Sequence, residues 1–231
     1  MRTSRTSRRS LRGGRRCTGA VLGAVALAST VLTGLVVAGS SPAHAADPYK
    51  PSGGSINLAL APGSSVVFTI MPSLTSTTCT SFTLSGAVEN PAAPRAHSTR
   101  AGYLNGLTGT CTTPQYGATQ VTTATPWDLE ITGDAPSGST QWPAAITGVD
   151  IDVDWIHADC TYDLHGDITG TFDTATQKFT ALGSTLVFDN SAGADCATFD
   201  ILDGDPVDVS ASWGGGSAVW VNSGTPITLG H

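Results

Sequence analysis

The sequence predicts an all-β protein, an antiparallel β-sandwich or barrel stapled by two disulfide bonds. After residue 45 the chain consists of short alternations of apolar and polar residues, broken by Gly, Pro, Asn, Asp and Ser. Thr, Val, Ile and aromatic residues dominate these runs, which is the composition of strands. Four cysteines follow residue 45, and no stretch keeps a helical period.

The first 45 residues have the composition of a targeting segment. Seven arginines lie between Arg2 and Arg16, a weakly apolar run covers Thr18–Gly39, and the small-residue site Ala43-His44-Ala45 follows. This order predicts a secretory signal peptide over residues 1–45, a mobile polar leader over 46–54 and a single β domain over 55–231. Ser7-Arg8-Arg9-Ser10-Leu11 is similar to a twin-arginine motif, so the general and twin-arginine export routes both stay open.

Removing the predicted signal changes the charge of the chain. The full sequence carries a net charge of −7, with 11 basic and 18 acidic residues. Only Lys50, Arg95, Arg100 and Lys178 remain after residue 45, against all 18 acidic residues, which gives −14. Such a surface repels phosphate backbones and anionic lipid, so nucleic acid and membrane are not expected partners. Divalent cations and cationic partners are allowed, although acidity alone also keeps an exported protein soluble.

Thirteen strands are expected, in chain order, at Ile56–Leu60, Val66–Met71, Ser81–Val88, Gln120–Thr125, Trp127–Thr132, Val149–His157, Thr161–Ile168, Thr171–Asp173, Lys178–Leu182, Thr185–Phe188, Ala197–Ile201, Val207–Trp213 and Ala218–Val221. Two places carry most of this prediction. Between Val149 and Trp155 apolar residues alternate with three aspartates, which puts an apolar and an acidic row on opposite faces of one strand. The segment Gly170–Phe179 has two short alternations around a polar tetrad, which indicates a hairpin.

The four cysteines allow three disulfide connectivities, and the sequence alone does not choose among them. We favour Cys79–Cys111 and Cys160–Cys196, because these pairings close short loops. Metal ligation is the weaker alternative, since no C-x-x-C pair is present. Cys17 lies in the predicted signal and has no lipobox before it.

An internal echo surrounds two of the cysteines. Cys79-Thr80 leads to Leu84-x-Gly86, and Cys160-Thr161 leads to Leu164-x-Gly166. Each copy reaches its second cysteine after a turn that contains glycine. Duplication of a Cys-to-Cys β unit explains this echo and supports the favoured pairing, and chance explains it nearly as well.

Several of these short motifs also carry a resemblance. The A-x-A signal, Cys79-Thr80-Ser81, the Pro126-Trp127 pair, Gly170-Thr171-Phe172-Asp173 and the last cysteine are similar to uncharacterised secreted β-rich proteins of actinobacteria. The resemblance covers most of Leu74–Trp213. It implies an exported location and a host class, and it implies no activity.

No motif predicts catalysis. The G-x-S-x-G elbow of serine hydrolases is absent, and the two glutamates, Glu89 and Glu130, lie in no acid–base motif. His157 and His165 flank Cys160 and could form a pair across a turn, although two exposed polar positions are the plainer interpretation. His97 lies in a loop and His231 is the last residue. We therefore expect no enzyme, no cofactor and no catalytic or metal-binding residue.

Two kinds of binding site remain as alternatives. Calcium could bind Asp150, Asp152 and Asp154, or the loop with Asp200, Asp203, Asp205 and Asp208, although Asp-Gly and Asp-Pro are also ordinary turn residues. Exposed tryptophans could stack on sugar rings, with Trp142 the best candidate and Trp220 the second; Trp155 and Trp213 fit a core better. The expected function is that of a secreted, extracellular, non-enzymatic interaction protein, with a carbohydrate- or calcium-binding module as the alternative.

Overall fold

The computed structural model describes residues 47–231 except 124–125, 200 and 213–214, and it leaves out the side chain of residue 199. A boundary between Ala43 and His44 separates the chain into two units, and every described residue belongs to the second. This unit is all-β and antiparallel, as predicted. Its strands are β1 (Lys50–Ser52), β2 (Ser55–Leu60), β3 (Val66–Ile70), β4 (Thr75–Val88), β5 (Thr99–Thr113), β6 (Gly117–Thr122), β7 (Trp127–Ile131), β8 (Gln141–Trp155), β9 (Thr161–Asp173), β10 (Lys178–Ser184), β11 (Val187–Ala192), β12 (Val207–Ser210), β13 (Val219–Asn222) and β14 (Thr228–Gly230), with one 3₁₀ turn, η1 (Cys196–Phe199).

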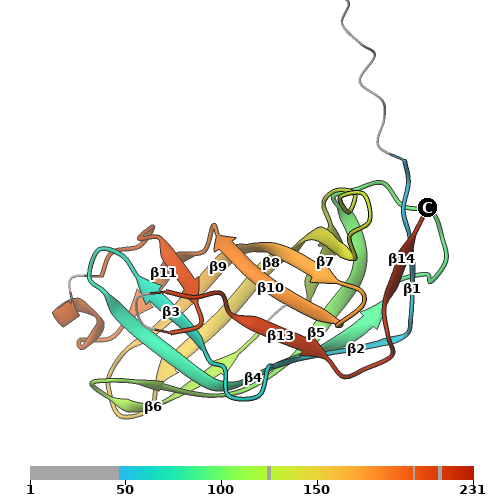
Figure 1. Ribbon diagram of the computed structural model, residues 1–231. Coiled ribbons are helices and arrows are strands. Elements are labelled where there is room, and N and C mark those ends of the chain that lie inside the picture. Colours follow the sequence, from blue (N-terminus) through green and yellow to red (C-terminus); the bar gives the residue numbers. More distant parts are fainter. Residues whose placement is uncertain (1–46, 124–125, 200, 213–214) are drawn as a thin grey trace, which may run out of the picture. The chain divides into compact units, whose positions relative to one another are not determined.

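Four long strands, β4, β5, β8 and β9, run the length of the unit, and each changes its short partners midway (Figure 1). Near the small β1–β14 sheet the short partners are β2, β7, β10 and β13; we call this the termini end. Near the cysteines they are β3, β6, β11 and β12; we call this the disulfide end.

The strand pairings close on themselves at both ends. At the termini end the circuit runs β2–β4–β5–β7–β8–β9–β10–β13 and back to β2. At the disulfide end β3, β4, β5, β6, β8, β9 and β11 follow one another, and a bridge from Val187 to Pro206 leads into β12 and back to β3. Of the two predicted architectures, the sandwich and the barrel, the closed barrel describes these pairings. Closure pairs the strand edges that would otherwise invite aggregation.

The closed sheet contains the same strand order twice. Strands β2 to β7 form repeat 1 (residues 55–131), and strands β8 to β13 form repeat 2 (residues 141–222). Continuous β8 takes the place of β2 and β3, and β10 and β11 together take the place of continuous β5. In both repeats the last two short strands cross over to pair with the first strand of the other repeat. The internal echo in the sequence therefore coincides with a repeated topology.

The two disulfides are Cys79–Cys111 and Cys160–Cys196, as favoured from the loop lengths. The predicted hairpin is also confirmed, because β9 ends at Asp173 and β10 begins at its partner Lys178. Tryptophan, phenylalanine and tyrosine side chains fill the interior, among them Phe82 and Trp220, whose ring centres lie 6.3 Å apart. Within the described residues no helix has the length and apolar character needed to cross a membrane.

The largest difference from the sequence prediction is β5, for which no strand was expected. Its glycines resemble turn residues, yet they are needed for close packing of β5 on β4. A Cβ atom on Gly102 would lie 2.8 Å from the carbonyl oxygen of Ala87, and one on Gly109 would lie 3.0 Å from that of Ser81. The glycines of β5 thus permit a strand instead of ending one.

Three smaller differences concern single elements. The prediction of a strand at Ala197–Ile201 is wrong, because Cys196–Phe199 forms the turn η1. Part of the predicted mobile leader joins the fold: Tyr49 is fully buried, and Lys50–Ser52 pairs with β14, so the boundary at residue 55 comes too late. Strand β8 begins at Gln141, eight residues before the alternation that predicted it.

Candidate functional site

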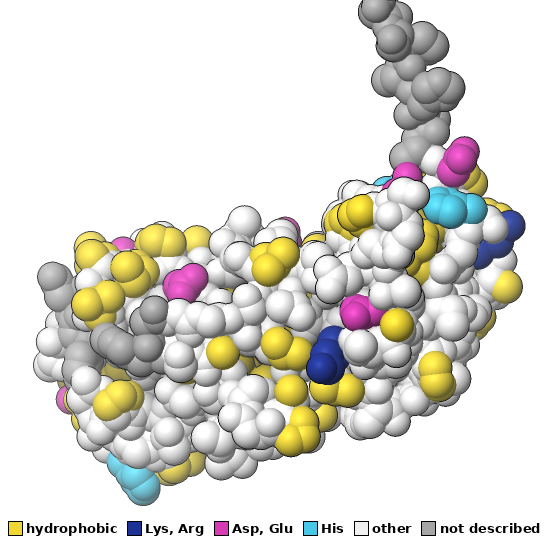
Figure 2. All heavy atoms as spheres, in the orientation of Figure 1, with side chains coloured by type: hydrophobic (Ala, Val, Ile, Leu, Met, Phe, Trp, Pro, Cys, Tyr) yellow, Lys and Arg dark blue, Asp and Glu magenta, His cyan; other side chains and the backbone are white. Residues whose placement is uncertain are grey.

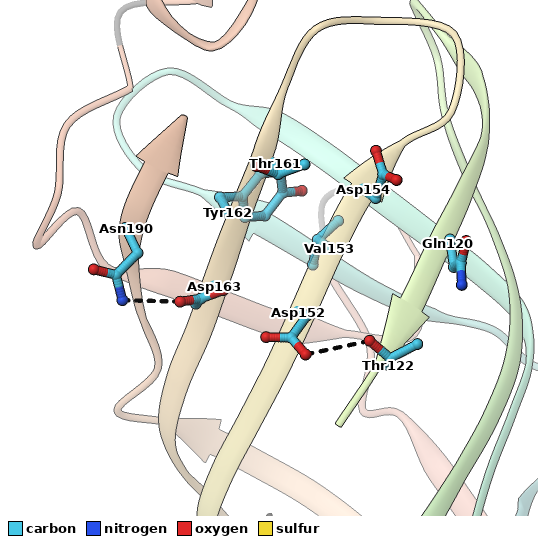
Figure 3. A pocket seen from close by; sticks show the side chains of 9 residues that line it. All are labelled: Gln120, Thr122, Asp152, Val153, Asp154, Thr161, Tyr162, Asp163 and Asn190. Atoms are coloured by element: carbon cyan, nitrogen blue, oxygen red, sulfur yellow. Dashed lines mark hydrogen bonds between the residues drawn. The ribbon is translucent and has the colours of Figure 1, made fainter. Parts of the chain in front are cut away.

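A shallow groove of about 320 Å³ crosses the outer face of four strands at the disulfide end (Figure 3). The strands are β6, β8, β9 and β11. Polar side chains make up most of the lining, which consists of Gln120, Thr122, Asp152, Val153, Asp154, Thr161, Tyr162, Asp163 and Asn190. We take this groove as the candidate functional site.

The carboxylates reach the groove because of strand alternation. In β8 the residues Ile151, Val153 and Trp155 are buried, while Asp152 and Asp154 between them face outward, as the sequence predicted. In β9 the buried Tyr162 likewise lies beside the outward Asp163. The apolar side of each strand thus anchors the polar side rigidly against the core.

The register places carboxylates directly opposite one another. Asp163 is the cross-strand partner of Asp152 on one side and of Asp189 on the other. Thr122 donates a hydrogen bond of 3.2 Å to Asp152, and Asn190 donates one of 2.8 Å to Asp163 (Figure 3). Like charges facing each other across a sheet are destabilising, and these two neutral donors offset only part of that repulsion.

Positive side chains are segregated from this groove. All four lysines and arginines of the described residues, Lys50, Arg95, Arg100 and Lys178, lie at the termini end. Figure 2 accordingly shows its dark blue side chains away from β3 and β11. At the disulfide end the described acidic residues include Asp152, Asp154, Asp159, Asp163, Asp189, Asp195, Asp203, Asp205 and Asp208. The groove therefore lies in a region of negative charge that no described lysine or arginine offsets.

The predicted calcium clusters do not converge. Asp150, Asp152 and Asp154 follow one another along one strand face, so their Cα atoms are spaced about 6.6 Å apart, too far for all three to reach one ion. In the second cluster Asp203 accepts hydrogen bonds from Ser191 of β11, and Asp205 accepts one from the Leu202 amide within their turn, so both carboxylates hold this loop in place. Asp200 lies outside the described residues. No three His, Cys, Asp or Glu residues in the described part of the chain are arranged to hold a metal ion.

The histidines do not form the pair considered from the sequence. His157 lies in the β8–β9 turn, whereas His165 is the partner of Asp150 well along β9 and lies 3.6 Å from Asp189. The closer histidine contacts are at the termini end. There His97 Nε2 lies 2.9 Å and His231 Nε2 lies 3.7 Å from the same oxygen of Asp134.

The expectation that Trp142 and Trp220 are exposed is wrong. Trp142 is 6% exposed at the start of β8, and Trp220 is 1% exposed in β13. Trp127 and Trp155 are equally buried, and Trp213 lies outside the described residues. None of the described tryptophans can present a ring face to a sugar.

Sequence reasoning missed the residues that complete the groove, above all Asp163 and Asn190. The missing signal is register, because a hairpin with its turn at residues 156–160 places Asp163 opposite Asp152. Asn190 depends on a third strand, β11, whose pairing with β9 is not encoded in neighbouring residues.

No protein-family model, curated protein or solved structure matches this chain.

Proposed function

We propose that the chain is an exported, non-enzymatic interaction protein that binds a cationic partner in the groove of β6, β8, β9 and β11. The observation that carries this proposal is the row of facing carboxylates, Asp152, Asp163 and Asp189, at an end whose described residues include no lysine or arginine. A bound cation would neutralise the part of this repulsion that the neighbouring hydrogen-bond donors and His165 do not offset.

Export is supported by two independent features. The first 45 residues have the order of a signal peptide. The two disulfides that hold the disulfide end together are typical of oxidising, extracytoplasmic compartments. The charge of −14 that remains after residue 45 fits a protein that meets a cationic partner there.

A cation with several contact points suits the groove better than the two earlier alternatives. A sugar site of the usual kind needs an aromatic platform, and the described tryptophans are buried. Calcium needs oxygen atoms that surround one point, whereas these carboxylates form an extended row. Lysine or arginine side chains of a polypeptide can each meet a separate carboxylate along such a row.

Titration of fluorescent oligolysine tests the proposal. We expect binding that weakens with salt and that falls by about fivefold or more in D152N/D163N, because two facing charges are removed without changing side-chain size. The control is D47N, which removes an exposed charge ahead of β1 and should change affinity less than about twofold. Equal effects of both variants, or no binding at low salt, would refute the groove as a cation site.

Calcium forms a separate arm of this experiment. The melting temperature of the protein is measured in millimolar calcium and in chelator. A calcium-dependent rise that disappears in D152N/D163N would replace the polypeptide partner by the metal ion as the ligand of the groove.

A further inference from the structure

Four exposed hydrophobic side chains gather around the start of β12. The large hydrophobic residues that remain exposed in the described chain are Met71 (39%), Leu74 (48%), Ile156 (54%), Leu182 (67%) and Leu202 (65%). All except Ile156 belong to segments that meet at Pro206 and Val207. Figure 2 shows hydrophobic side chains on this face of the unit, over the end that carries β3 and β11.

Backbone contacts fix this arrangement. Met71 and Leu74 lie in the turn between β3 and β4. The Met71 amide donates a hydrogen bond to the Pro206 carbonyl at 2.9 Å, and the Leu74 amide donates one to the Ile70 carbonyl. Leu202 lies in the tight turn just before Pro206, where the Asp205 amide donates to its carbonyl at 2.9 Å.

Strand β10 brings the fourth side chain to the same place. Leu182 occupies the irregular point of β10 between Ala181 and Gly183. Two residues later, the Ser184 hydroxyl donates a hydrogen bond to the Val207 carbonyl at 2.6 Å. The Val207 amide in turn donates one to the Leu186 carbonyl. We call the set Met71, Leu74, Leu182 and Leu202 the β12 patch. Single exposed leucines are ordinary, whereas several exposed hydrophobic residues on adjoining segments mark an interaction surface.

The surroundings of the β12 patch are acidic. Asp203 follows Leu202 directly, and Asp208 is an exposed residue of β12. Asp203 also accepts hydrogen bonds from Ser191, the neighbour of the groove residue Asn190, so the patch borders the groove wall. As at the groove, the described residues of this end include no lysine or arginine.

We propose that the β12 patch docks an amphipathic, basic polypeptide segment of another protein, whose apolar side chains cover the four exposed residues while its lysines or arginines face the carboxylates. This deepens the proposed function by naming the partner class. Charge complementarity selects this occupant. A second copy would place one acidic rim against an identical one, and anionic lipid would be repelled.

The test compares two labelled peptides of equal charge by fluorescence anisotropy, an amphipathic Leu/Lys peptide and oligolysine. We expect the amphipathic peptide to bind at least about tenfold more tightly, because burial of leucine side chains adds to the charge term. L74S/L202S should remove this advantage. I156S is the matched control, since it alters an exposed residue at the counterpart turn of repeat 2 and should change affinity less than about twofold.

Each outcome separates the β12 patch from the groove. Equal affinities for the two peptides, or equal effects of I156S and L74S/L202S, would overturn the docking surface and leave the groove proposal intact. Selective amphipathic binding that D152N/D163N does not weaken would support the patch and sink the groove. Dimers or anionic-vesicle binding that L74S/L202S abolishes would show a second copy or lipid as the occupant instead.

Discussion

Strands β4 and β9, which are equivalent in the two repeats, carry residues of the same kind toward the core and differ in their outer residues. Toward the core, Phe82 and Leu84 of β4 correspond to Tyr162 and Leu164 of β9, and all four are at most 2% exposed. Facing outward, β4 carries Ser81, Thr83 and Ser85, whereas β9 carries Thr161, Asp163 and His165. The repeated strand arrangement therefore constrains the residues that face the core and leaves the outward residues free to differ.

A bulge explains the one offset between the two strands. Cys79 precedes Phe82 by three positions, whereas Cys160 precedes Tyr162 by two. The extra residue, Thr80, lies at the register shift between β4 and β5. Once it is removed, the cysteine, aromatic, leucine and glycine positions coincide. Because β4 forms the equivalent strand with neutral outer residues, the carboxylates of the groove are additions that the fold does not require.

The disulfides provide the largest test of this comparison. Replacing either cysteine pair by alanine should cost about 4 kcal/mol of unfolding free energy, because the loops close over 32 and 36 residues. Urea unfolding of the two double variants measures both costs. Costs that differ by more than about 1.5 kcal/mol would show that the repeats are not stabilised in the same way.

Gly86 and Gly166 test whether the repeats share a close approach between strands. A Cβ atom on Gly86 would overlap the carbonyl oxygen of Tyr103, and one on Gly166 would lie 2.6 Å from that of Thr185. We expect each glycine-to-alanine change to cost about 3 kcal/mol or more through overpacking. Gly117→Ala is the control, since its position has positive φ but open space, and should cost about 1 kcal/mol. A mild effect at only one of the two sites would contradict their equivalence.

The sequence predicted the features that depend on local patterns and missed those that depend on contacts between strands. Alternation in Val149–Trp155 predicted which carboxylates face outward, because period 2 is a local property. The cysteine spacing left three connectivities open, and the pairing favoured from its short loops is the one that forms. Strand β5 was missed because Gly102 and Gly109 are explained only by contacts with Ala87 and Ser81 on β4.

The candidate site was predicted only in part, for a related reason. Asp152 and Asp154 were recognised, but their facing partner Asp163 needed the exact register of a hairpin. Trp142 was misjudged because its neighbours Gln141 and Pro143 resemble a loop, whereas all three residues begin β8, where Trp142 is the cross-strand partner of Phe172 in β9. Non-local pairing therefore accounts for both errors.

The Tyr162 hydroxyl is an inner feature of β9 that its counterpart in β4, Phe82, lacks. It lies 3.1 Å from Thr77 Oγ1 in the core, and burial raises the pKa of Tyr162. Tyr162→Phe should cost about 1 kcal/mol, because it leaves the Thr77 hydroxyl without this partner. Adding Thr77→Val should recover most of that loss in a double-mutant cycle. Additive losses would show that the two hydroxyls do not act as a pair.

Exchanging an outer residue tests whether the acidic face costs stability. Asp163→Thr gives β9 the outer residue of β4 and removes the charge that faces Asp152 and Asp189. We expect a gain of about 0.5 kcal/mol at low salt that shrinks as salt screens the repulsion. Thr83→Asp is the reverse exchange, opposite neutral Thr108 and Ala59, and should change stability less. A loss in Asp163→Thr would mean that the Asn190 hydrogen bond outweighs the repulsion.

The smallest expected effect is on the pH dependence of stability, at one carboxyl group near the end of each strand. At the last residue of β9, hydrogen bonds from the Thr140 and Thr176 hydroxyls lower the pKa of Asp173 below its ordinary 3.8. Directly after β4, a hydrogen bond from Arg100 lowers the pKa of Glu89 below its ordinary 4.5. Depressed carboxyl pKa values stabilise the fold above the ordinary value, and this stability is lost as pH falls through the lower folded value. Asp173→Asn and Glu89→Gln should each flatten the acid limb of the stability curve below pH 3.8 and 4.5 respectively. Salt should weaken only the Glu89 effect, because Arg100 is charged and the threonine hydroxyls are not. Equal salt sensitivity in urea unfolding would show that both carboxyl groups depend on ion pairs.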